Sequence, residues 1–361
     1  MSAVRAGTIL IMAGGTGGHV FPGLAVADEL RDRGWKVVWM GARAGMEARL
    51  VPARGYPVEW IRAAALRGKG LAAALLLPLH LCVGFWQSAR AIFRVRPDVV
   101  LGMGGYVAFP GGMMASLLAR PLAVHEQNAI AGLANRVLAG VADRKLEAFP
   151  GALKGAEWTG NPVRADIAAV AEPAGRFAGR TGPLRLLVVG GSLGAQALND
   201  CLPRALALIE EAARPVVTHQ SGEKHLEALK KNYRDEGVKA EAVAFIDDMA
   251  RRYAEADLVI CRAGATTIAE LAAGGMPSVL VPYPHAVDDH QSANARFLAD
   301  RGAAILLPQE RLTPEGLATL IRSLDRDALL AMAIKARAMG KPEAARTVAD
   351  RCAELVEGRR A

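Results

Sequence analysis

Cysteine is scarce in this sequence of 361 residues, and its four cysteines stand far apart. They are Cys82, Cys201, Cys261 and Cys352, and no two of them form a C-x-x-C pair. This spacing excludes the common zinc-binding and thiol-redox motifs. It is typical of reduced thiols in the cytosol.

Long hydrophobic runs are also missing. The apolar stretch 71–86 is broken by Pro78 and His80 and falls short of the ~20 residues that a membrane span requires. Residues 99–119 carry no charge, but five glycines and Pro110 interrupt them, which favours a buried strand, loop and helix. The apolar run before Gly14 has only five residues, too few for a secretory signal. We therefore expect neither a membrane span nor a signal peptide.

Several nucleotide and metal motifs are absent as well. No glycine-rich loop fits G-x-G-x-x-G or ends in Gly-Lys-Ser/Thr, and no acidic residue for a ribose follows the strand that we expect to end near Met40. No histidine pair has H-E-x-x-H spacing, and we interpret Asp325 and Asp327 as a solvated helix turn. These absences argue against a dinucleotide dehydrogenase and a Walker-type NTP hydrolase. We expect no metal requirement and no cofactor.

Two glycine-rich loops are present instead, about one domain apart. The loop AGGTGGH (13–19) follows the apolar run 8–12, and the loop GGSLGA (190–195) follows the apolar run 184–189. Each precedes a helix-like segment. Such loops lack Cβ atoms, so their backbone N–H groups and a helix N-terminus can approach a phosphate. The duplication predicts two halves that face one cleft.

Short apolar strands alternate with helical segments in both halves. We expect strands without polar alternation, which is the pattern of a parallel sheet covered on both faces, at 36–40, 99–101, 122–124, 215–218, 243–245, 258–261 and 278–281. Each half is therefore predicted to be a doubly wound α/β unit. We expect an N-terminal domain over 1–163, a C-terminal domain over 164–340, and a last helix within 341–361 that returns to the first domain.

The net charge of +8 is carried by the first half. Residues 1–163 contain 18 Lys and Arg against 10 Asp and Glu, whereas residues 164–361 contain 26 of each kind. Such an excess is typical of a domain with an anionic partner, either nucleic acid or a membrane surface, although a solvated basic face gives the same count.

Six motifs, taken together and in order, resemble those of the MurG family of bacterial peptidoglycan glycosyltransferases. They are GGTGGHVFP (14–22), GMGGY (102–106), HEQN (125–128), GNPVR (160–164), GGSLGA (190–195) and RAGATTIAE (262–270).

The resemblance implies a GT-B fold, with two Rossmann-like domains around the active site and no metal. It implies transfer of N-acetylglucosamine (GlcNAc) from UDP-GlcNAc, with inversion, to the MurNAc 4-hydroxyl of lipid I, undecaprenyl-pyrophosphoryl-MurNAc-pentapeptide, giving lipid II. The C-terminal domain would hold the donor. The N-terminal domain would hold the acceptor at the cytoplasmic face of the anionic inner membrane, which agrees with the charge count.

The resemblance also assigns the donor site. It places Glu270 on the ribose, Ser192 on the phosphates and Gln291 on the GlcNAc hydroxyls, with uracil against the backbone of Ile246. Taken by itself, Thr267-x-x-Glu270 is a capping-box pattern. The expected UDP-GlcNAc contacts are Thr16, Gly17, Gly18, Asn128, Arg164, Ser192, Ile246, Ala265, Thr266, Thr267, Ile268, Ala269, Glu270, Gln291 and Asn294.

In the N-terminal domain the resemblance indicates where the acceptor binds. A hydroxyl nucleophile loses its proton as it attacks, and either His19 or Glu126 could accept it; we favour His19. His19 could instead only position the acceptor diphosphate. The expected contacts of that diphosphate are Gly14, Gly15, Gly104, Gly105 and Tyr106.

An apolar stripe at helical spacing is the last candidate. Such a stripe usually marks a buried core, but basic residues flank this one and it resembles the membrane-binding patch of the family. Its members are Leu75, Leu79, Cys82 and Trp86.

Two rival functions stay open. A GT-B enzyme could glycosylate another lipid such as diacylglycerol, although the 102–106 and 125–128 motifs argue against it. A basic nucleic-acid-binding domain would need an RNP, KH or helix-turn-helix signature, and none is visible. We therefore expect no nucleic-acid partner.

Overall fold

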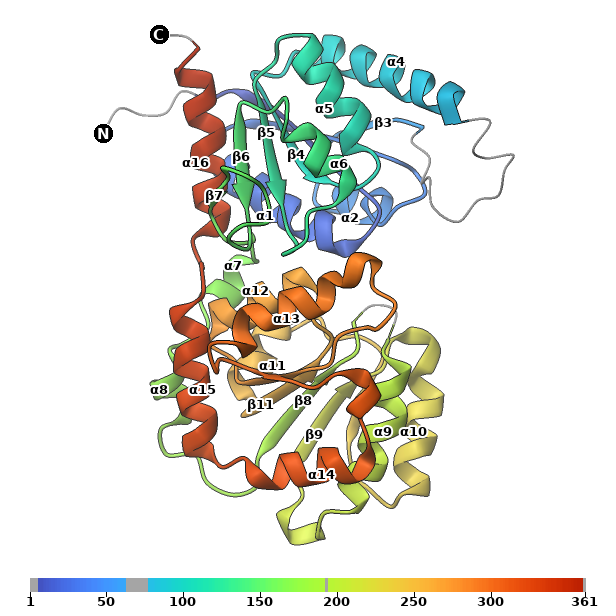
Figure 1. The fold of residues 1–361 in the computed structure, drawn as a ribbon, viewed down its shortest axis with the longest axis vertical. Helices are drawn as coiled ribbons and strands as arrows, with labels where there is room; N and C mark the ends of the chain where they lie inside the picture. The colour runs from blue at the N-terminus through green and yellow to red at the C-terminus, as the bar shows by residue number, and fades with distance from the viewer. Residues whose placement is uncertain (1–5, 63–76, 192–193, 360–361) are drawn as a thin grey trace. The chain divides into compact units, whose positions relative to one another are not determined.

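The computed structural model describes residues 6–62, 77–191 and 194–359, which form two compact units. Unit 1 consists of Met1–Arg164 and Glu343–Ala361, and unit 2 of Ala165–Pro342. Each unit has its own parallel sheet with helices on both faces (Figure 1). The predicted pair of doubly wound parallel sheets is confirmed.

The sheet of unit 1 has seven parallel strands in the order β3-β2-β1-β4-β5-β6-β7. The strands are β1 (Thr8–Ala13), β2 (Lys36–Gly41), β3 (Val58–Trp60), β4 (Val99–Gly104), β5 (Leu122–Glu126), β6 (Arg144–Glu147) and β7 (Glu157–Trp158). The helices are α1 (Gly17–Asp32), α2 (Glu47–Ala53), α4 (Leu77–Val95), α5 (Ala108–Leu117), α6 (Leu133–Leu138) and α16 (Ala344–Glu357).

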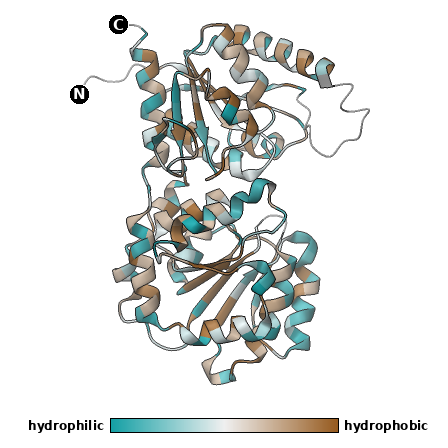
Figure 2. Ribbon diagram, viewed as in Figure 1, coloured by the Kyte–Doolittle hydropathy of each residue, from teal (hydrophilic) through white to brown (hydrophobic). Residues whose placement is uncertain are grey.

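Alternate residues of β1 serve two different cores. Ile9 and Ile11 pack with residues of α1 and α16, whereas Leu10 and Met12 pack with residues of α4 and α5. This alternation is the strand period of two, here with both faces buried. Most strands carry hydrophobic colouring in Figure 2, as burial on both faces requires, whereas β6 is largely hydrophilic. The last helix, α16, therefore belongs to the core of unit 1.

The sheet of unit 2 has six parallel strands in the order β10-β9-β8-β11-β12-β13. The strands are β8 (Arg185–Val189), β9 (Val216–Gln220), β10 (Glu241–Val243), β11 (Leu258–Cys261), β12 (Ser278–Leu280) and β13 (Ile305–Leu306). The α-helices are α7 (Ala165–Ala168), α8 (Pro173–Phe177), α9 (Gln196–Ala207), α10 (Leu226–Asp235), α11 (Met249–Glu255), α12 (Ala265–Gly274), α13 (His290–Ala299), α14 (Pro314–Ser323) and α15 (Arg326–Ala338). Short 3-10 helices occupy Glu211–Ala213, Glu223–His225, Val287–Asp289 and Gln309–Arg311.

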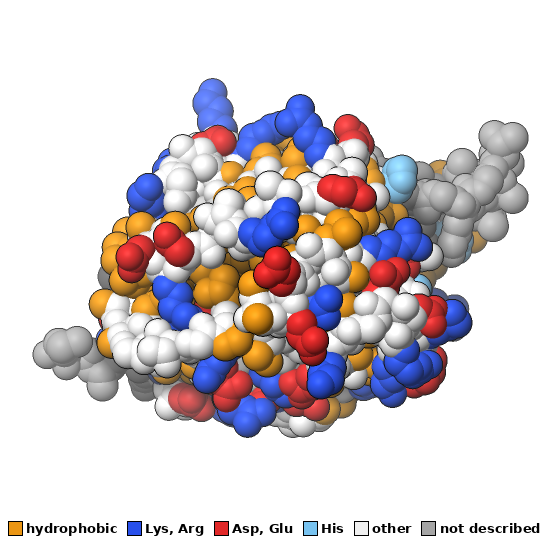
Figure 3. All heavy atoms as spheres, turned by 90° about the horizontal axis from the view of Figure 1, so that it is seen from below, with side chains coloured by type: hydrophobic (Ala, Val, Ile, Leu, Met, Phe, Trp, Pro, Cys, Tyr) orange, Lys and Arg blue, Asp and Glu red, His pale blue; other side chains and the backbone are white. Residues whose placement is uncertain are grey.

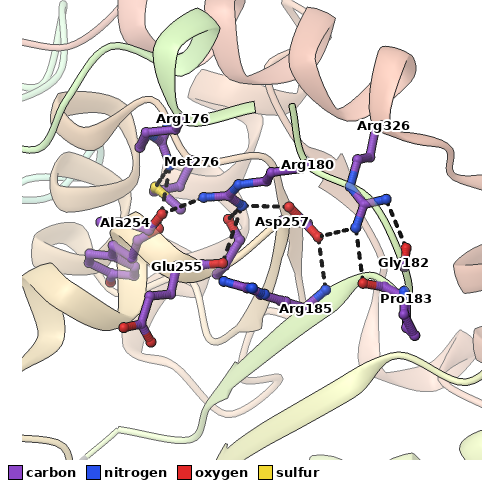
Figure 4. A network of polar contacts seen from close by, with 12 residues as sticks. Arg176, Arg180, Gly182, Pro183, Arg185, Ala254, Glu255, Asp257, Met276 and Arg326 are labelled. Atoms are coloured by element: carbon purple, nitrogen blue, oxygen red, sulfur yellow. Dashed lines mark hydrogen bonds and ion pairs between the residues drawn. The ribbon is translucent and has the colours of Figure 1, made fainter. Parts of the chain in front are cut away.

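A buried carboxylate fastens α15 and the segment after α8 to the sheet of unit 2 (Figure 4). Asp257 is fully buried and accepts from Arg180 at 2.5 Å, from Arg326 at 3.1 Å and from the backbone N–H of Arg185 at 2.9 Å. Two guanidinium groups and a backbone donor satisfy both oxygens, which is the condition under which a buried charge is tolerated. Asp257 directly precedes β11, at the edge of the sheet opposite the glycine-rich loop, so this network supports the scaffold.

Two smaller expectations can be compared with these elements. Asp325 is the N-cap of α15 and accepts from the N–H of Ala328 at 2.8 Å, so the helix-turn interpretation is confirmed. The strand predicted at 243–245 is misplaced, because β10 ends at Val243. Phe245 is exposed and lies beyond the end of the strand, and an apolar run of three residues does not show at which residue a strand ends.

The surface of the molecule carries both signs of charge. In the view of Figure 3, acidic and basic side chains are interspersed rather than gathered by sign. Among the described helices, none is both long and apolar enough to span a membrane.

Candidate active site

The first glycine-rich loop joins β1 to α1 and is held by a buried carboxylate. Gly15 has a φ of +94°, which glycine adopts without strain. Its N–H donates to Glu47 Oε2 at 3.0 Å, and Glu47 Oε1 accepts from the N–H of Ala42 at 3.0 Å. Thr16 is the N-cap of α1, and Gly17 and Gly18 lie in its first turn. The loop thus presents the N-terminus of α1 from a shape fixed by Glu47.

The glycines that follow β4 lie directly against this loop. A Cβ on Gly105 would sit 2.2 Å from the carbonyl oxygen of Gly14, and a Cβ on Gly104 would sit 2.9 Å from Nδ1 of His19. Both distances are shorter than real Cβ atoms allow. The 102–106 motif therefore needs glycine because two backbones and an imidazole meet there.

Tyr106 completes this group of residues. Its ring carbon Cε1 lies 3.4 Å from the position that a Cβ on Gly15 would take. Burial, and then the charge of Glu47, raises the pKa of the Tyr106 phenol, which keeps it neutral. Unit 1 thus brings together the residues predicted to contact the acceptor diphosphate, namely Gly14, Gly15, Gly104, Gly105 and Tyr106.

His19 lies on α1 and contacts the HEQN motif (125–128) at the end of β5. Its Nδ1 is 2.7 Å from Oε1 of Gln127, whose Nε2 is 2.8 Å from the carbonyl oxygen of His125 and 2.9 Å from His125 Nδ1. His125 Nε2 is in turn 2.9 Å from the carbonyl oxygen of Gly160. The His19 ring is partly exposed, whereas Gln127 and His125 are fully buried. His19 is thus the accessible end of a chain of buried hydrogen bonds.

Glu126, the other candidate base, is buried and surrounded by donors. It is 1% exposed. Oε1 accepts from the N–H of Asn128 at 2.8 Å, and Oε2 accepts from the N–H of Gly132 at 3.1 Å and from Asn135 Nδ2 at 2.9 Å. A carboxylate held by donors from three residues is suited to fixing the turn after β5. Asn128, a predicted sugar contact, is partly exposed beside it.

The second glycine-rich loop follows β8 and is held by an amide. The N–H of Gly191 donates to Gln220 Oε1 at 3.1 Å, while Gln220 Nε2 donates to the carbonyl oxygens of Gly191 at 3.0 Å and Ala244 at 3.2 Å. One side chain from the end of β9 thus fixes both polar groups of Gly191. Ser192, a predicted phosphate contact, lies outside the described residues.

The segment predicted to bind the ribose forms the start of α12. The helix begins at Ala265 and its N-cap is Gly264, without a side-chain cap, so the capping-box interpretation of Thr267 and Glu270 is wrong. Glu270 Oε2 accepts from the hydroxyl of Tyr253 at 3.2 Å. The predicted contacts Ala265, Thr266, Thr267, Ile268, Ala269 and Glu270 all lie in the first two turns of this helix.

Thr266 has an orphaned polar atom at that helix start. Its hydroxyl is buried and has no hydrogen-bond partner within the part of the chain that the structure describes. Buried polar atoms are nearly always paired. A ligand with a hydrogen-bonding group at the N-terminus of α12 would supply the missing partner.

The remaining donor-site candidates differ in how available they are. Gln291 Oε1 already accepts from the N–H of Tyr283 at 2.9 Å, and Asn294 is fully buried, with Nδ2 donating to the carbonyl oxygen of Ala263 at 3.2 Å. Ile246 is buried directly after Phe245. Arg164 is the last residue of the first segment of unit 1. Asn294 thus acts on the turn that leads into α12.

The apolar stripe lies on α4 of unit 1. Leu79 is 61% exposed and Trp86 62% exposed, and Cys82 is exposed as well; Leu75 lies outside the described residues. The guanidinium carbon of Arg90 lies 5.7 Å from the ring centroid of Trp86. The described part of the stripe is therefore surface and not core. It borders a hollow of about 290 Å³ lined in part by Trp60, Trp86 and Arg90.

Three residues of these sites were not singled out from the sequence. Gln127 lies inside the HEQN motif, so its neighbours were a signal, but Glu47 and Gln220 belong to no motif. Within the described ranges, no group of three or more His, Cys, Asp or Glu side chains is arranged to hold a metal ion.

Two parallel α/β units, each with a glycine-rich loop between its first strand and the next helix, define the GT-B class of glycosyltransferases. The chain belongs to glycosyltransferase family 28: the N-terminal domain model of that family matches residues 9–146 and the C-terminal domain model matches residues 185–348.

Two close relatives of this chain have the same name. The chain is 68% identical to the UDP-N-acetylglucosamine–N-acetylmuramyl-(pentapeptide) pyrophosphoryl-undecaprenol N-acetylglucosamine transferase of Aromatoleum aromaticum, over 98% of this chain and 99% of that protein. It is 64% identical to the transferase of the same name from an Azoarcus species, again over 98% and 99% of the two chains.

Solved structures agree with this likeness. The chain is 42% identical to the Acinetobacter baumannii MurG, whose crystal structure superposes with a TM-score of 0.84 over 96% of this chain and 99% of that one. The calicheamicin glycosyltransferase CalG4 shares the fold at 17% identity, with a TM-score of 0.65 over 98% and 99%.

Proposed function

We propose that this protein transfers GlcNAc from UDP-GlcNAc to the MurNAc 4-hydroxyl of lipid I and so forms lipid II. The observation that carries the proposal is the 68% identity, over nearly the full length of both chains, to a transferase named for this reaction. In the transfer, the acceptor O4 forms a bond to the anomeric carbon as the bond from that carbon to UDP breaks. The hydroxyl proton goes to a base, and UDP leaves.

Unit 2 is the proposed donor site. A loop at Gly191 and the N-terminus of α12 supply backbone N–H groups and helix-dipole charge for a diphosphate. The orphaned hydroxyl of Thr266 and the carboxylate of Glu270 lie on the same helix. We assign Glu270 to the ribose, and the other donor contacts follow the family resemblance.

Unit 1 is the proposed acceptor site, with His19 as the general base. His19 is partly exposed, whereas Glu126 is 1% exposed and already accepts from three residues. A base needs a lone pair within reach of the substrate proton. Access therefore favours His19 over Glu126.

General-base catalysis contributes ~10²–10⁴-fold, so His19→Ala lowers kcat in that range while the KM for UDP-GlcNAc stays within about twofold. Glu126→Gln keeps the shape of that side chain and serves as the comparison. A pH profile of kcat that loses its acid limb in Glu126→Gln but keeps it in His19→Ala would move the role to Glu126.

We also propose that α4 rests on the cytoplasmic face of the inner membrane. Exposed Leu79 and Trp86 are apolar anchors, and each basic side chain near an anionic surface adds ~1 kcal/mol. Leu79→Glu weakens binding to anionic vesicles in a salt-dependent manner. Val216→Glu, at an equally exposed apolar residue of unit 2, serves as the matched control; equal binding of both variants contradicts the assignment.

The reaction itself is tested with UDP-GlcNAc and a lipid I analogue, following UDP release and the disaccharide product. UDP-glucose and diacylglycerol serve as the alternative donor and acceptor. Faster transfer to diacylglycerol than to the lipid I analogue would replace the proposed acceptor.

A further inference from the structure

The side chain of Gln127 is fully buried between His19 and His125. Its orientation is settled by one neighbour, the backbone carbonyl oxygen of His125, 2.8 Å from Nε2. A carbonyl oxygen only accepts hydrogen bonds, so the atom beside it is the amide nitrogen and not Oε1. The flipped amide would place two acceptors in contact.

Oε1 of Gln127 therefore faces His19. It lies 2.7 Å from Nδ1 of the imidazole, and an amide oxygen only accepts. The hydrogen in this contact must come from His19, so Nδ1 carries it. In the neutral ring, Nε2 is then left with the lone pair.

His125 secures the other end of the amide. Its Nε2 is 2.9 Å from the carbonyl oxygen of Gly160 and so carries the hydrogen, which leaves Nδ1 to accept from Gln127 Nε2 at 2.9 Å. Burial lowers the pKa of His125 to about 4, against the smaller opposing effect of the Gly160 contact. The ring stays neutral at physiological pH and its Nδ1 stays an acceptor.

Space is made for this arrangement by Gly104. An added Cβ there would lie 2.9 Å from His19 Nδ1 and 3.0 Å from Cε1. The ring is thus confined between a glycine and the amide of Gln127. These two neighbours thus fix the orientation of the His19 ring, and Gln127 also fixes which ring nitrogen carries the proton.

We propose that Gln127 is a positioning residue that holds His19 in the Nδ1–H tautomer, so that Nε2 is the atom that receives the proton of the acceptor hydroxyl. Which ring nitrogen carries the proton is set by the partner of the other nitrogen. The catalytic part of this inference rests on the proposed role of His19. The assignment of the tautomer does not depend on that role.

The direct test is the nitrogen-15 NMR spectrum of histidine-labelled full-length protein. Wild type is expected to show His19 mainly as the Nδ1–H tautomer, and Gln127→Met, of similar size but without hydrogen bonds to either histidine, is expected to lose that preference. Assignment comes from the signal missing in His19→Ala. An Nε2–H tautomer in wild type, or an unchanged tautomer in Gln127→Met, overturns the proposal.

Gln127→Glu is the second variant, should Gln127→Met fold poorly by circular dichroism. A glutamate at 127 still accepts from Nδ1–H of His19 through one oxygen, so this variant is expected to keep the proton on Nδ1. Its other oxygen replaces Nε2 and faces two acceptors of His125, so the NMR signal of His19, and not kcat, is the readout of this variant. Loss of the Nδ1–H signal in Gln127→Glu would contradict the role given to Oε1.

Kinetics test the catalytic consequence. Gln127→Met is expected to lower kcat at least about tenfold with the KM for UDP-GlcNAc within twofold, and the double variant with His19→Ala is expected to be no slower than His19→Ala alone. Multiplying losses would show that Gln127 acts independently of His19. Normal kcat in His19→Ala would refute the proposed base, while the NMR comparison would still decide the tautomer.

Discussion

The two glycine-rich loops occupy equivalent places in their sheets but are held by side chains of different charge. Gly15, after β1, donates to the carboxylate of Glu47, which follows the neighbouring strand β2. Gly191, after β8, is bound at both its N–H and its C=O by the amide of Gln220 at the end of the neighbouring strand β9. Both loops are fixed in shape, but only the first has a negative charge behind it.

This difference in charge should affect how strongly each loop binds an anion. A neutral amide holds the loop of unit 2 without weakening the positive potential of its N–H groups, which suits a diphosphate leaving group. A carboxylate behind the loop of unit 1 opposes an anion there. The loop of unit 1, which is expected to contact the acceptor diphosphate through Gly14 and Gly15, should therefore bind an anion more weakly than the loop of unit 2.

The largest effect is expected when the carboxylate is removed. Glu47→Ala leaves the N–H groups of Gly15 and Ala42 unpaired, which costs about 2–4 kcal/mol in the free energy of unfolding. Urea denaturation measures this cost. Glu59→Ala breaks a more exposed ion pair with Arg94 in the same unit and is expected to cost under ~1 kcal/mol. Equal costs would mean that Glu47 does not hold the loop.

The second-largest effect is expected when a negative charge is introduced behind the loop of unit 2. Gln220→Glu puts a carboxylate oxygen against the carbonyl oxygens of Gly191 and Ala244 and a charge behind the proposed phosphate site. At ~1.5–3 kcal/mol for a charged contact, the KM for UDP-GlcNAc should rise roughly tenfold or more. Gln220→Met, which adds no charge, should raise it less. A donor KM insensitive to charge at 220 would remove the distinction between the loops.

Glu270→Ala, also in unit 2, is expected to raise the KM for UDP-GlcNAc as much as Gln220→Glu or slightly less. Removing the proposed charge-assisted hydrogen bond from Glu270 to the ribose, worth ~1.5–3 kcal/mol, should raise the donor KM about tenfold. Tyr253→Phe removes only the hydroxyl that donates to Glu270 and should change KM less than threefold. Steady-state kinetics with varied UDP-GlcNAc distinguish them, and equal effects would make Glu270 merely the partner of Tyr253.

The smallest expected effect is on acid stability, to which each unit contributes one buried histidine. Burial lowers the pKa of His125 to about 4 and that of His219 to about 3, against ~6.5 in the unfolded chain. The unfolded state therefore binds protons first as pH falls, and stability decreases by about 1 kcal/mol per histidine between pH 6.5 and 5.5.

Urea midpoints measured across this pH range provide the check. His219→Phe leaves the hydroxyl of Tyr233, now 2.9 Å from His219 Nδ1, unpaired at every pH, but it should flatten the pH dependence. An unchanged slope would place the sensitivity of unit 2 elsewhere.

Much of the fold could be predicted because central parallel strands are buried on both faces and read as apolar runs. The runs at 36–40 and 258–261 became β2 and β11 nearly residue for residue. The last two strands of the sheet of unit 1, β6 and the edge strand β7, were missed, since Arg144–Glu147 and Glu157–Trp158 are short and largely charged. The capping box failed because α12 begins two residues before Thr267.

The candidate site was predictable only where a motif marks it. The glycines at 14, 15, 104 and 105 could be named from sequence because they stand in glycine-rich motifs. In the structure a Cβ would clash at 14, 104 and 105, and Gly15 has a positive φ. Gln127 could not, because its role depends on which of its amide atoms faces His19. Glu47 and Gln220 accept hydrogen bonds from loops some 30 residues away in the sequence, and no local sequence pattern predicts such a contact.

The place of α16 affects how the protein is made. Its side chains Val348, Cys352 and Val356 fill the same core as β1, and Arg351 pairs with Glu157 at 2.7 Å. All of unit 2 is translated between β7 and this helix. On the ribosome, unit 2 can finish its own sheet while unit 1, begun first, still lacks one wall of its core. The first-made half of the molecule is thus the last to be completed.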